Sequence, residues 1–332
     1  MSHPEGSAPQ PLLQVENLHI ALTTDAGSFP AVEGVSFDIA RGETVGLVGE
    51  SGCGKSITAL SIMGLLKPPL GLAGGRIRLT GQEIQNLPAA ELRALRGKRI
   101  AMIFQEPMTA LNPLKPVGRQ IAEMFVLHQG ASWAEAERKA VEALTQVKVP
   151  APGRRAKDYP HQLSGGMRQR VMIAIALACE PDLLIADEPT TALDVTVQAE
   201  IVDLMKELCA ARGTAILMIS HDLGLVTDIC KRVCVMYAGR IVEQQDSEQI
   251  FNHPRHPYTQ GLVASLPRLG MRAQHGRRKL MEIAGVVPGI TAYPGGCRFN
   301  PRCSRATEIC TKVVPELEPL GDGSLVRCHH HG

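Results

Sequence analysis

The chain has 332 residues and a hydrophobic content of 44%, which allows one large domain with an appendage, or two modest domains, around a sizeable core. A net charge of +2 gives no overall basic field and aromatic residues make up only 3%, so the composition argues against nucleic acid as a partner. No apolar run approaches the roughly 18 residues of a membrane span and residues 1–11 lack the apolar segment of a signal peptide, so we expect a soluble, intracellular protein with a disordered N-terminal tail at 1–11.

Short alternating strands are predicted early in the chain. Val35, Phe37 and Ile39 alternate with small or polar residues, as in a half-buried strand. Three other stretches read similarly, with Gly-containing turns between them: Leu13–Val15, Leu18–Leu22 and Ile77–Leu79. We therefore expect a small, mostly antiparallel sheet beside a parallel core.

Four further apolar runs do not alternate, which is typical of parallel strands covered on both faces. They are Thr44–Val48, Ile100–Phe104, Leu183–Ala186 and Ala215–Ile219. Each ends in a polar group, in turn a glycine-rich loop, Gln105, Asp187-Glu188 and Ser220-His221. Ligands of open α/β sheets lie beyond the carboxyl ends of the strands, so these endings predict a ligand site.

The glycine-rich loop reads Gly49-Glu50-Ser51-Gly52-Cys53-Gly54-Lys55-Ser56, with a strand before it and a helical stretch after it. This is the G-x-x-x-x-G-K-[ST] pattern in the context that it requires, which argues against a chance Gly-rich turn. Backbone N–H groups and the helix N-terminus would bind phosphates. Lys55 would reach the β- and γ-phosphates, and the Ser56 hydroxyl would bind Mg²⁺.

Residues from about 108 to 180 predict an inserted helical lobe, because Gln120–Leu127 and Ala134–Val147 carry helical patterns between Gly and Pro breaks. A later helix is predicted from apolar residues spaced for one face, with Gly213 as its stop: Val197, Ile201, Leu204 and Leu208.

Two carboxylates follow the buried run Leu183–Ala186. Asp187 suits a Mg²⁺-organising role, directly or through water, and Glu188 is placed to accept a proton from a water that attacks the γ-phosphate. Strands often end in acidic turns, so the pair is a weak signal alone. Downstream of a P-loop it is a strong one.

A second anion site is predicted where Leu163–Arg170 opens a helix. Ser164 is a sensible N-cap, and Gly165 and Gly166 expose backbone N–H groups at the positive end of that helix. A capped helix after a Pro-containing loop explains the same residues without a ligand, and Ser-Gly-Gly alone favours that explanation.

Taken together, residues 13 to about 265 resemble the ATP-binding-cassette (ABC) ATPases. Leu163–Arg170 is similar to their signature sequence. Gln105 resembles the loop glutamine that touches Mg²⁺ and reports to the membrane partner, and Asp194, in Ala192-Leu193-Asp194, resembles the loop that crosses the dimer interface. His221 resembles the switch histidine at the γ-phosphate.

The resemblance implies a P-loop (RecA-like) α/β core with an antiparallel β subdomain and a helical subdomain at about 108–180, which together form a nucleotide-binding domain at 12–265. It implies ATP hydrolysis coupled to transport by two cassettes packed head to tail, each ATP lying between one P-loop and the opposite Ser164–Gly166. An aromatic stacked on adenine is also implied. Phe29 is the nearest candidate, although it would equally serve as packing in the small sheet.

Several later stretches are similar to the extension of dipeptide/oligopeptide-type importers, and we assign residues 266–332 to it: His256–Leu262, Gly285–Pro288 and Pro294–Cys303. The form Met167-Arg168 and the run Thr190–Asp194 look like the "D"-type ATPase of that group. The resemblance implies an "F"-type ATPase partner, two integral membrane permease subunits, a periplasmic or surface solute-binding protein, and a peripheral position on the cytoplasmic face of the bacterial inner membrane.

Four of the nine cysteines crowd into the last 36 residues: Cys297, Cys303, Cys310 and Cys328. Four thiolates match the ligand count of a [4Fe–4S] cluster or of a structural zinc. Zinc ribbons use tighter pairs and the resemblance points to iron–sulfur, so we favour the cluster over zinc or no metal. The cluster would staple a tail with little core of its own. A basic stretch at 268–279 reads as a solvated linker.

Other function classes fit less well. A soluble ABC ATPase acting on nucleic acid or ribosomes commonly carries two cassettes or a coiled-coil insertion. The second anion site argues against a P-loop kinase or GTPase, and Glu188 with His221 argues against a module that only binds. Within the importer hypothesis the solute stays open among peptides, nickel chelates, glutathione and glycans.

Overall fold

A computed structural model describes residues 10–105, 110–191, 193–266 and 283–331 of the chain. The chain divides into two compact units that interleave in sequence. The first comprises Met1–Leu12, Ile39–Glu43 and Thr80–Leu217, and the second comprises Leu13–Asp38, Thr44–Leu79 and Met218–Gly332. Residues 1–9 of the predicted tail at 1–11, and all of the basic stretch at 268–279, lie outside the described residues.

The first unit contains two of the predicted core strands. β6 (Ile100–Ile103) pairs in parallel with β7 (Leu183–Asp187), in the register Ile100↔Leu183 to Ile103↔Ala186. All five residues of β7 are buried, which explains why its sequence does not alternate. β8 (Ala215–Ser220) begins in this unit, where Ala215 N–H donates to the carbonyl of Asp182.

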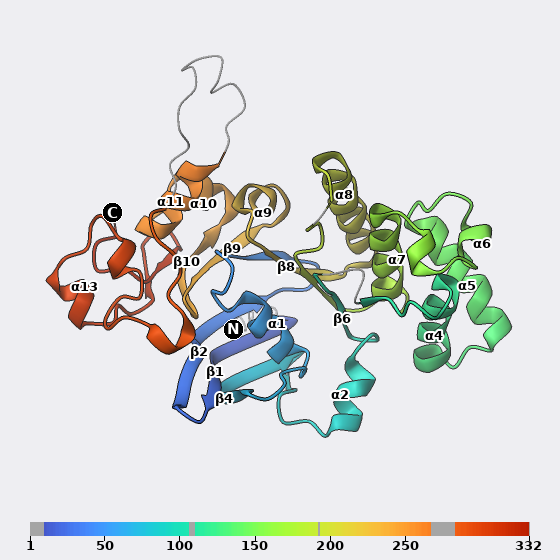
Figure 1. The fold of residues 1–332 in the computed structure, drawn as a ribbon, viewed down its shortest axis with the longest axis horizontal. Helices are drawn as coiled ribbons and strands as arrows, with labels where there is room; N and C mark the ends of the chain where they lie inside the picture. The colour runs from blue at the N-terminus through green and yellow to red at the C-terminus, as the bar shows by residue number, and fades with distance from the viewer. Residues whose placement is uncertain (1–9, 106–109, 192, 267–282, 332) are drawn as a thin grey trace, which may run out of the picture. The chain divides into compact units, whose positions relative to one another are not determined.

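Helices gather in the first unit, and Figure 1 shows α4 to α7 together in green. The predicted helical lobe is thus present, as are the predicted later helix and its stop at Gly213, which takes a φ of 68°. The helices and short elements of this unit are β5 (Gln82–Glu83), α2 (Ala89–Leu95), α4 (Val117–Gln129), α5 (Trp133–Gln146), α6 (Pro152–Arg155), η1 (Pro160–Gln162), α7 (Gly165–Leu177) and α8 (Val195–Arg212).

An antiparallel sheet in the second unit confirms the predicted small sheet, with corrected bounds. β1 (Leu13–Thr24) lies between β2 (Gly27–Ile39) and β4 (Leu70–Leu79), and it runs antiparallel to β4. The two short strands expected at Leu13–Val15 and Leu18–Leu22 are one strand. An irregularity between Glu16 and His19 interrupts its alternation, so the sequence reads as two pieces.

The other sheet of the second unit has the strand order β11-β12-β10-β9-β3-β8. β3 (Thr44–Val48) is parallel to β9 (Arg232–Tyr237), which forms an antiparallel pair with β10 (Arg240–Asp246). The C-terminal strands β11 (Glu318–Pro319) and β12 (Leu325–Val326) extend this sheet, because β12 pairs with β10. The sequence did not predict these added strands.

In the described stretch 283–331 the buried apolar residues include Phe299, Cys310 and Val326, so this region has a small core. The helices of the second unit are α1 (Lys55–Ile62), α9 (Leu223–Ile229), α10 (Ser247–Asn252), α11 (Pro257–Ser265), η2 (Ile290–Ala292), η3 (Asn300–Arg302) and α13 (Glu308–Lys312). Within the described ranges, no helix is both long and apolar enough to cross a bilayer.

Candidate functional site

The P-loop follows β3 and ends where α1 begins at Lys55, as the pattern requires. Gly54 caps α1 with a φ of 107°, a conformation that an L side chain rarely adopts. At Gly49 a Cβ would lie 2.1 Å from the carbonyl oxygen of Met236, so no side chain fits there. These two glycines therefore set a backbone path that other residues cannot follow.

Lys55 lies within this loop, with only 5% of its surface exposed. Its Nζ donates to the carbonyl oxygens of Gly49 at 2.7 Å and Glu50 at 3.1 Å. Cys53 is buried beside it, and burial raises the pKa of the Cys53 thiol, which stays protonated at neutral pH. The ammonium of Lys55 is thus held by carbonyls of the loop itself, and phosphate oxygens would compete with these carbonyls for it.

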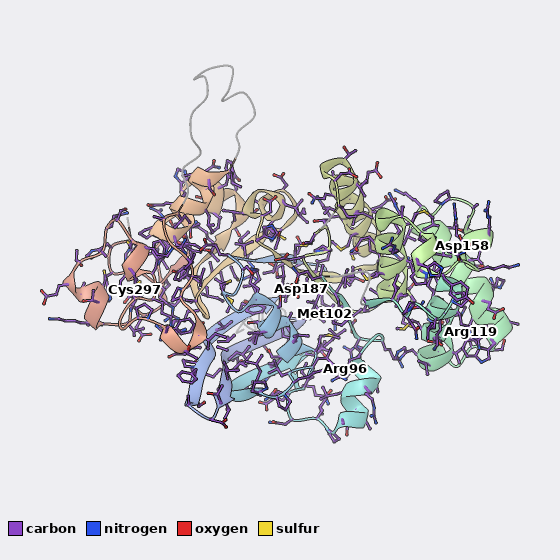
Figure 2. The ribbon with its side chains drawn as sticks, viewed as in Figure 1. Arg96, Met102, Arg119, Asp158, Asp187 and Cys297 are labelled. Atoms are coloured by element: carbon purple, nitrogen blue, oxygen red, sulfur yellow. The ribbon has the colours of Figure 1, made fainter. Side chains whose placement is uncertain are left out.

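The predicted acid pair lies at the end of β7, and Figure 2 labels Asp187 there. Asp187 is 5% exposed. The carboxylate of Glu188 accepts hydrogen bonds from Gln105 Nε2 at 2.9 Å and from Thr191 Oγ1 at 3.0 Å. Glu188 has a positive φ of 46°, a strained conformation that is common at functional sites. The structure therefore brings Gln105 and Glu188 together, as the strand endings predicted.

Thr191 contacts the predicted base, a contact that the sequence analysis did not predict. Its hydroxyl occupies the second contact of the Glu188 carboxylate, so it fixes the side chain of the predicted base. The available signal was its position three residues after Glu188, in the turn that leads to α8.

Ser164 caps α7, because its side chain accepts a hydrogen bond from Met167 N–H. Ser164 and Gly165 are exposed, so the first N–H groups of α7 face solvent and are available to an anion. A Cβ on Gly166 would lie 3.0 Å from Val197, so this position is tight. Asp194 caps α8 in the same unit, with its carboxylate accepting from Val197 N–H at 3.0 Å.

His221 follows β8 directly and is exposed. The turn around it is fixed by two bonds, from Asp222 N–H to Ser220 Oγ at 3.0 Å and from Leu225 N–H to the Asp222 carboxylate at 3.1 Å. In the second unit β8 is next to β3 in the sheet, so the switch-like histidine and the P-loop follow neighbouring strands. Phe29, the candidate for adenine stacking, is partly buried on β2.

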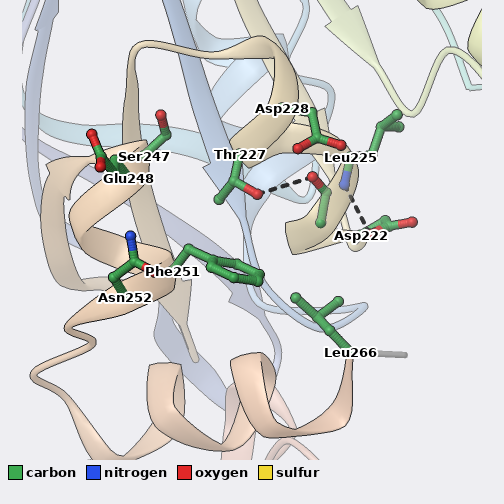
Figure 3. A pocket seen from close by; sticks show the side chains of 10 residues that line it. Asp222, Leu225, Thr227, Asp228, Ser247, Glu248, Phe251, Asn252 and Leu266 are labelled. Carbon is green, nitrogen blue, oxygen red and sulfur yellow. Dashed lines mark hydrogen bonds between the residues drawn. The ribbon is translucent and has the colours of Figure 1, made fainter. Parts of the chain in front are cut away.

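A cavity of about 710 Å³ lies beyond this turn, between α9 and α10, and contains none of the predicted site residues. Figure 3 shows its wall with the carboxylates of Asp222, Asp228 and Glu248 beside the apolar Phe251 and Leu266. Its acidic character does not suit a triphosphate, because like charges repel.

The four C-terminal cysteines are free thiols that line one small cavity. Burial, together with the neighbouring cysteines, raises the pKa of Cys297, labelled in Figure 2, to about 11. We name Cys297, Cys303, Cys310 and Cys328, with the backbone that joins them, the four-cysteine module. In the described part of the chain, no three His, Cys, Asp or Glu side chains are arranged to hold a metal ion.

His256 also lines this cavity and is fully buried. Its Nδ1 accepts from Tyr258 N–H at 3.0 Å, and burial lowers its pKa to about 3, so the ring is neutral with its proton on Nε2. The Arg327 carbonyl favours that proton, but within the described residues Nε2 has no partner in hydrogen-bond geometry. The four cysteine thiols and this N–H group of His256 therefore line the same small cavity.

Comparisons with known proteins show the family of the chain. The family described as "ABC transporter" matches residues 32–191, and "Oligopeptide/dipeptide transporter, C-terminal region" matches residues 242–310. The chain is 46% identical over 319 residues to the dipeptide transport ATP-binding protein DppD of Escherichia coli, covering 96% of both chains. It is 49% identical over 331 residues to the oligopeptide transport ATP-binding protein OppD of Salmonella typhimurium, covering 99% of this chain and 97% of that one.

Solved structures show the same fold. A dimeric ATP-binding cassette, MJ0796, bound to ADP and Pi matches with a TM-score of 0.64 and 28% identity, over 71% of this chain and 98% of that chain. The cbiO1 protein of Clostridium perfringens, part of the transporter complex cbiONQ, matches with a TM-score of 0.62 and 28% identity. The match covers 74% of this chain and 92% of that chain. The predicted α/β cassette fold is thereby confirmed.

Proposed function

The chain belongs to the ABC transporter family, as an ATPase whose hydrolysis of ATP is coupled to transport, and we propose that it powers the import of dipeptides or oligopeptides. One observation carries the choice of solute class. The similarity to DppD and OppD runs through the C-terminal region as well as the cassette, with 96% or more of this chain covered in each comparison. Nickel chelates, glutathione and glycans remain the alternative cargoes.

We assign the ATP site as follows. Residues Gly49–Ser56 bind the phosphates, with Lys55 on the β- and γ-phosphates, and Phe29 stacks on adenine. Ser56, Gln105 and Asp187 would hold Mg²⁺, which would neutralise charge on the phosphates. Glu188 takes a proton from the attacking water as the water oxygen bonds to the γ-phosphorus and the bond from that phosphorus to the β–γ bridging oxygen breaks, which releases ADP. His221 donates a hydrogen bond to the γ-phosphate. The support for Glu188 as base is its hydrogen bonds to Gln105 and Thr191, which hold the carboxylate in one position.

We further propose that the site is completed by a second ATPase subunit of the "F" type. Ser164, Gly165 and Gly166 of one subunit would contact the γ-phosphate held by the P-loop of the other, with Asp194 at the interface. The support is the exposed start of α7 and the dimeric state of MJ0796 bound to ADP and Pi. Two permease subunits and a solute-binding protein would complete the importer, with this chain on the cytoplasmic face of the inner membrane.

We propose that residues 12–265 form the nucleotide-binding domain and 266–332 an extension in which Cys297, Cys303, Cys310 and Cys328 hold a [4Fe–4S] cluster, with zinc as the alternative. The support is that none of the four cysteines forms a disulfide and that all four line one cavity with the N–H of His256. A cluster there would crosslink segments that are distant in sequence.

The function is tested by reconstituting this chain with its partner ATPase, both permease subunits and the binding protein in proteoliposomes. We expect ATP-dependent uptake of labelled dipeptide or oligopeptide, and no uptake with Lys55→Ala in this chain. Uptake of nickel chelates, glutathione or glycans in place of peptides would overturn the solute class. A rate of ATP hydrolysis that is the same with and without the permease subunits would overturn the assignment as an importer subunit.

A further inference from the structure

A partly buried ion pair links the P-loop to the C-terminal region of the second unit. Only 5% of the Arg302 side chain is exposed, and its guanidinium pairs with both carboxylate oxygens of Glu50, at 2.6 Å and 3.0 Å. Glu50 is the second residue of the P-loop. Two parallel N–H···O bonds in a sheltered setting are among the strongest and most directional contacts between side chains.

The guanidinium is also fixed on its other edges. Its Nε donates to the carbonyl of Ala284 at 2.8 Å, and Nη2 donates to that of Ile283 at 3.2 Å. The rings of Tyr237 and Phe299 lie 5.7 Å and 6.0 Å from its centre. Arg302 is thus held in one rotamer before it contacts Glu50, so little side-chain entropy remains to be lost in that pair.

The backbone of Glu50 has a second C-terminal partner. Its N–H donates to the Tyr258 hydroxyl at 2.9 Å. Tyr258 is fully buried in the first turn of α11 and packs on Tyr237, with ring centroids 4.7 Å apart. Both the main chain and the side chain of Glu50 are therefore positioned by residues more than 200 positions away, with sequence separations of 208 and 252.

The backbone of Arg302 is part of the four-cysteine module, because Arg302 lies between Cys297 and Cys303. It ends η3 (Asn300–Arg302), and Cys303 follows it. Asn300 N–H donates to the Cys297 carbonyl at 2.9 Å, Cys303 N–H donates to the Asn300 carbonyl at 3.3 Å, and Cys297 N–H donates to the Cys310 carbonyl at 2.8 Å. Any change in how these cysteines are held therefore moves the turn that presents Arg302.

We propose that Arg302 is a positioning residue for ATP: it shapes the P-loop through Glu50, and it makes that shape depend on the integrity of the four-cysteine module. The inference rests on the proposed function, because it concerns regulation of the same ATP site. The pair also has an electrostatic purpose. A carboxylate in the phosphate-binding loop repels a triphosphate, and the paired guanidinium cancels that charge.

The test is titration of the full-length chain with a fluorescent ATP analogue, followed by KM and kcat in the assembled importer. We expect Arg302→Gln to raise the Kd and KM for ATP about tenfold with kcat within about twofold of wild type, because Glu50 is left unpaired. Arg302→Lys should keep part of the affinity for ATP, since the positive charge remains while the paired hydrogen bonds of the guanidinium are lost. The double variant Glu50→Gln/Arg302→Gln should bind ATP more tightly than Arg302→Gln alone.

Dependence on the module is tested with Cys303→Ser. It should raise the KM for ATP in the wild-type background and add little in the Arg302→Gln background, because both changes act through one contact. Lys312→Gln, which removes an exposed charge from α13, is the matched control and should leave KM unchanged.

An unchanged KM for ATP in Arg302→Gln would overturn this inference but not the proposed function. Fully additive effects of Arg302→Gln and Cys303→Ser on the KM would do the same. If Arg302→Gln fails to fold, Arg302→Lys and the double variant decide by the same readouts. Failure of the wild-type chain to bind ATP would instead overturn the proposed function.

Discussion

Gln105 and Glu188 are joined by a 2.9 Å hydrogen bond, which ties the residue after β6 to the residue after β7. The two residues are 83 positions apart in sequence, and each follows a parallel strand of the same sheet. The amide that the family resemblance assigns to Mg²⁺ and the membrane partner thus directly contacts the candidate base. Movement of the Gln105 loop would therefore change the position of the Glu188 carboxylate.

Replacement of the base should separate binding from hydrolysis. Glu188→Gln keeps the shape and the contacts to Gln105 and Thr191 but cannot accept a proton. We expect the rate of phosphate release to fall by about 10²-fold or more with ATP still bound, and the ATPase pair to stay associated in gel filtration with ATP and Mg²⁺. Hydrolysis at the wild-type rate would show that Glu188 is not the base.

Thr191 offers a subtler change at the same carboxylate. Valine has nearly the volume of threonine, so Thr191→Val removes the hydroxyl and its hydrogen bond to the Glu188 carboxylate with little change of shape. We expect kcat to fall roughly tenfold with KM for ATP nearly unchanged, since the loss affects positioning rather than binding. Thr191→Ser, which keeps the hydroxyl, is the control and should retain most activity. Equal losses in both variants would rule out this role of the hydroxyl.

The start of α7 can be tested by separating capping from anion binding. Ser164→Asp keeps an N-cap acceptor for Met167 N–H but adds a negative charge where the γ-phosphate is proposed to lie. We expect thermal stability within about 0.5 kcal/mol of wild type and a nearly complete loss of ATP hydrolysis in the assembled pair. Ser164→Ala should cost about 1 kcal/mol of stability. A wild-type rate of ATP hydrolysis in Ser164→Asp would show that Ser164 only caps α7 and does not contact the γ-phosphate.

A pH-dependent contribution to stability is expected at Glu33. Its carboxylate pairs with Arg240 at 2.9 Å and with Arg298 of the C-terminal region. Burial acts to raise the pKa, but the two arginines outweigh it and lower the pKa below the ordinary value of 4.5. A depressed carboxyl pKa stabilises the fold above about pH 4.5, and this contribution is lost as the pH falls through the folded pKa.

Glu33→Gln should therefore lower the melting temperature at about pH 7. The loss in free energy of unfolding should be on the order of 1 kcal/mol, after allowance for the partial exposure of Glu33. The difference from wild type should shrink as the pH is lowered below about 4. Melting curves of both proteins over this range measure it. A difference that stays constant with pH would show that the ionised form of Glu33 contributes nothing.

The sequence predicted well those features that have a local signature. β3, β6, β7 and β8 are apolar runs because both faces are covered, and the predicted cap Ser164 and the predicted stop Gly213 lie at the ends of their helices. The side chains at the ends of β6 and β7 meet because parallel strands end at one edge of a sheet.

Other features have no local signature. β10 contains Glu243, Gln244 and Gln245, which are polar but buried, so the strand did not read as an apolar run. The Glu243 carboxylate accepts from Arg255 N–H and His256 N–H outside the strand, and from Gln245 Nε2 within it. Arg302 and Tyr258 could not be assigned to the P-loop either, because contacts across 252 and 208 residues arise only from the tertiary fold.

The proposal that one subunit completes the ATP site of its mate is tested most directly by the structure of the assembled importer, carrying Glu188→Gln and trapped with ATP and Mg²⁺. The account predicts Ser164 Oγ within hydrogen-bond distance, about 3 Å, of the γ-phosphate held by the P-loop of the partner ATPase. A closed complex in which Ser164–Gly166 lies far outside hydrogen-bond range of every γ-phosphate would contradict it.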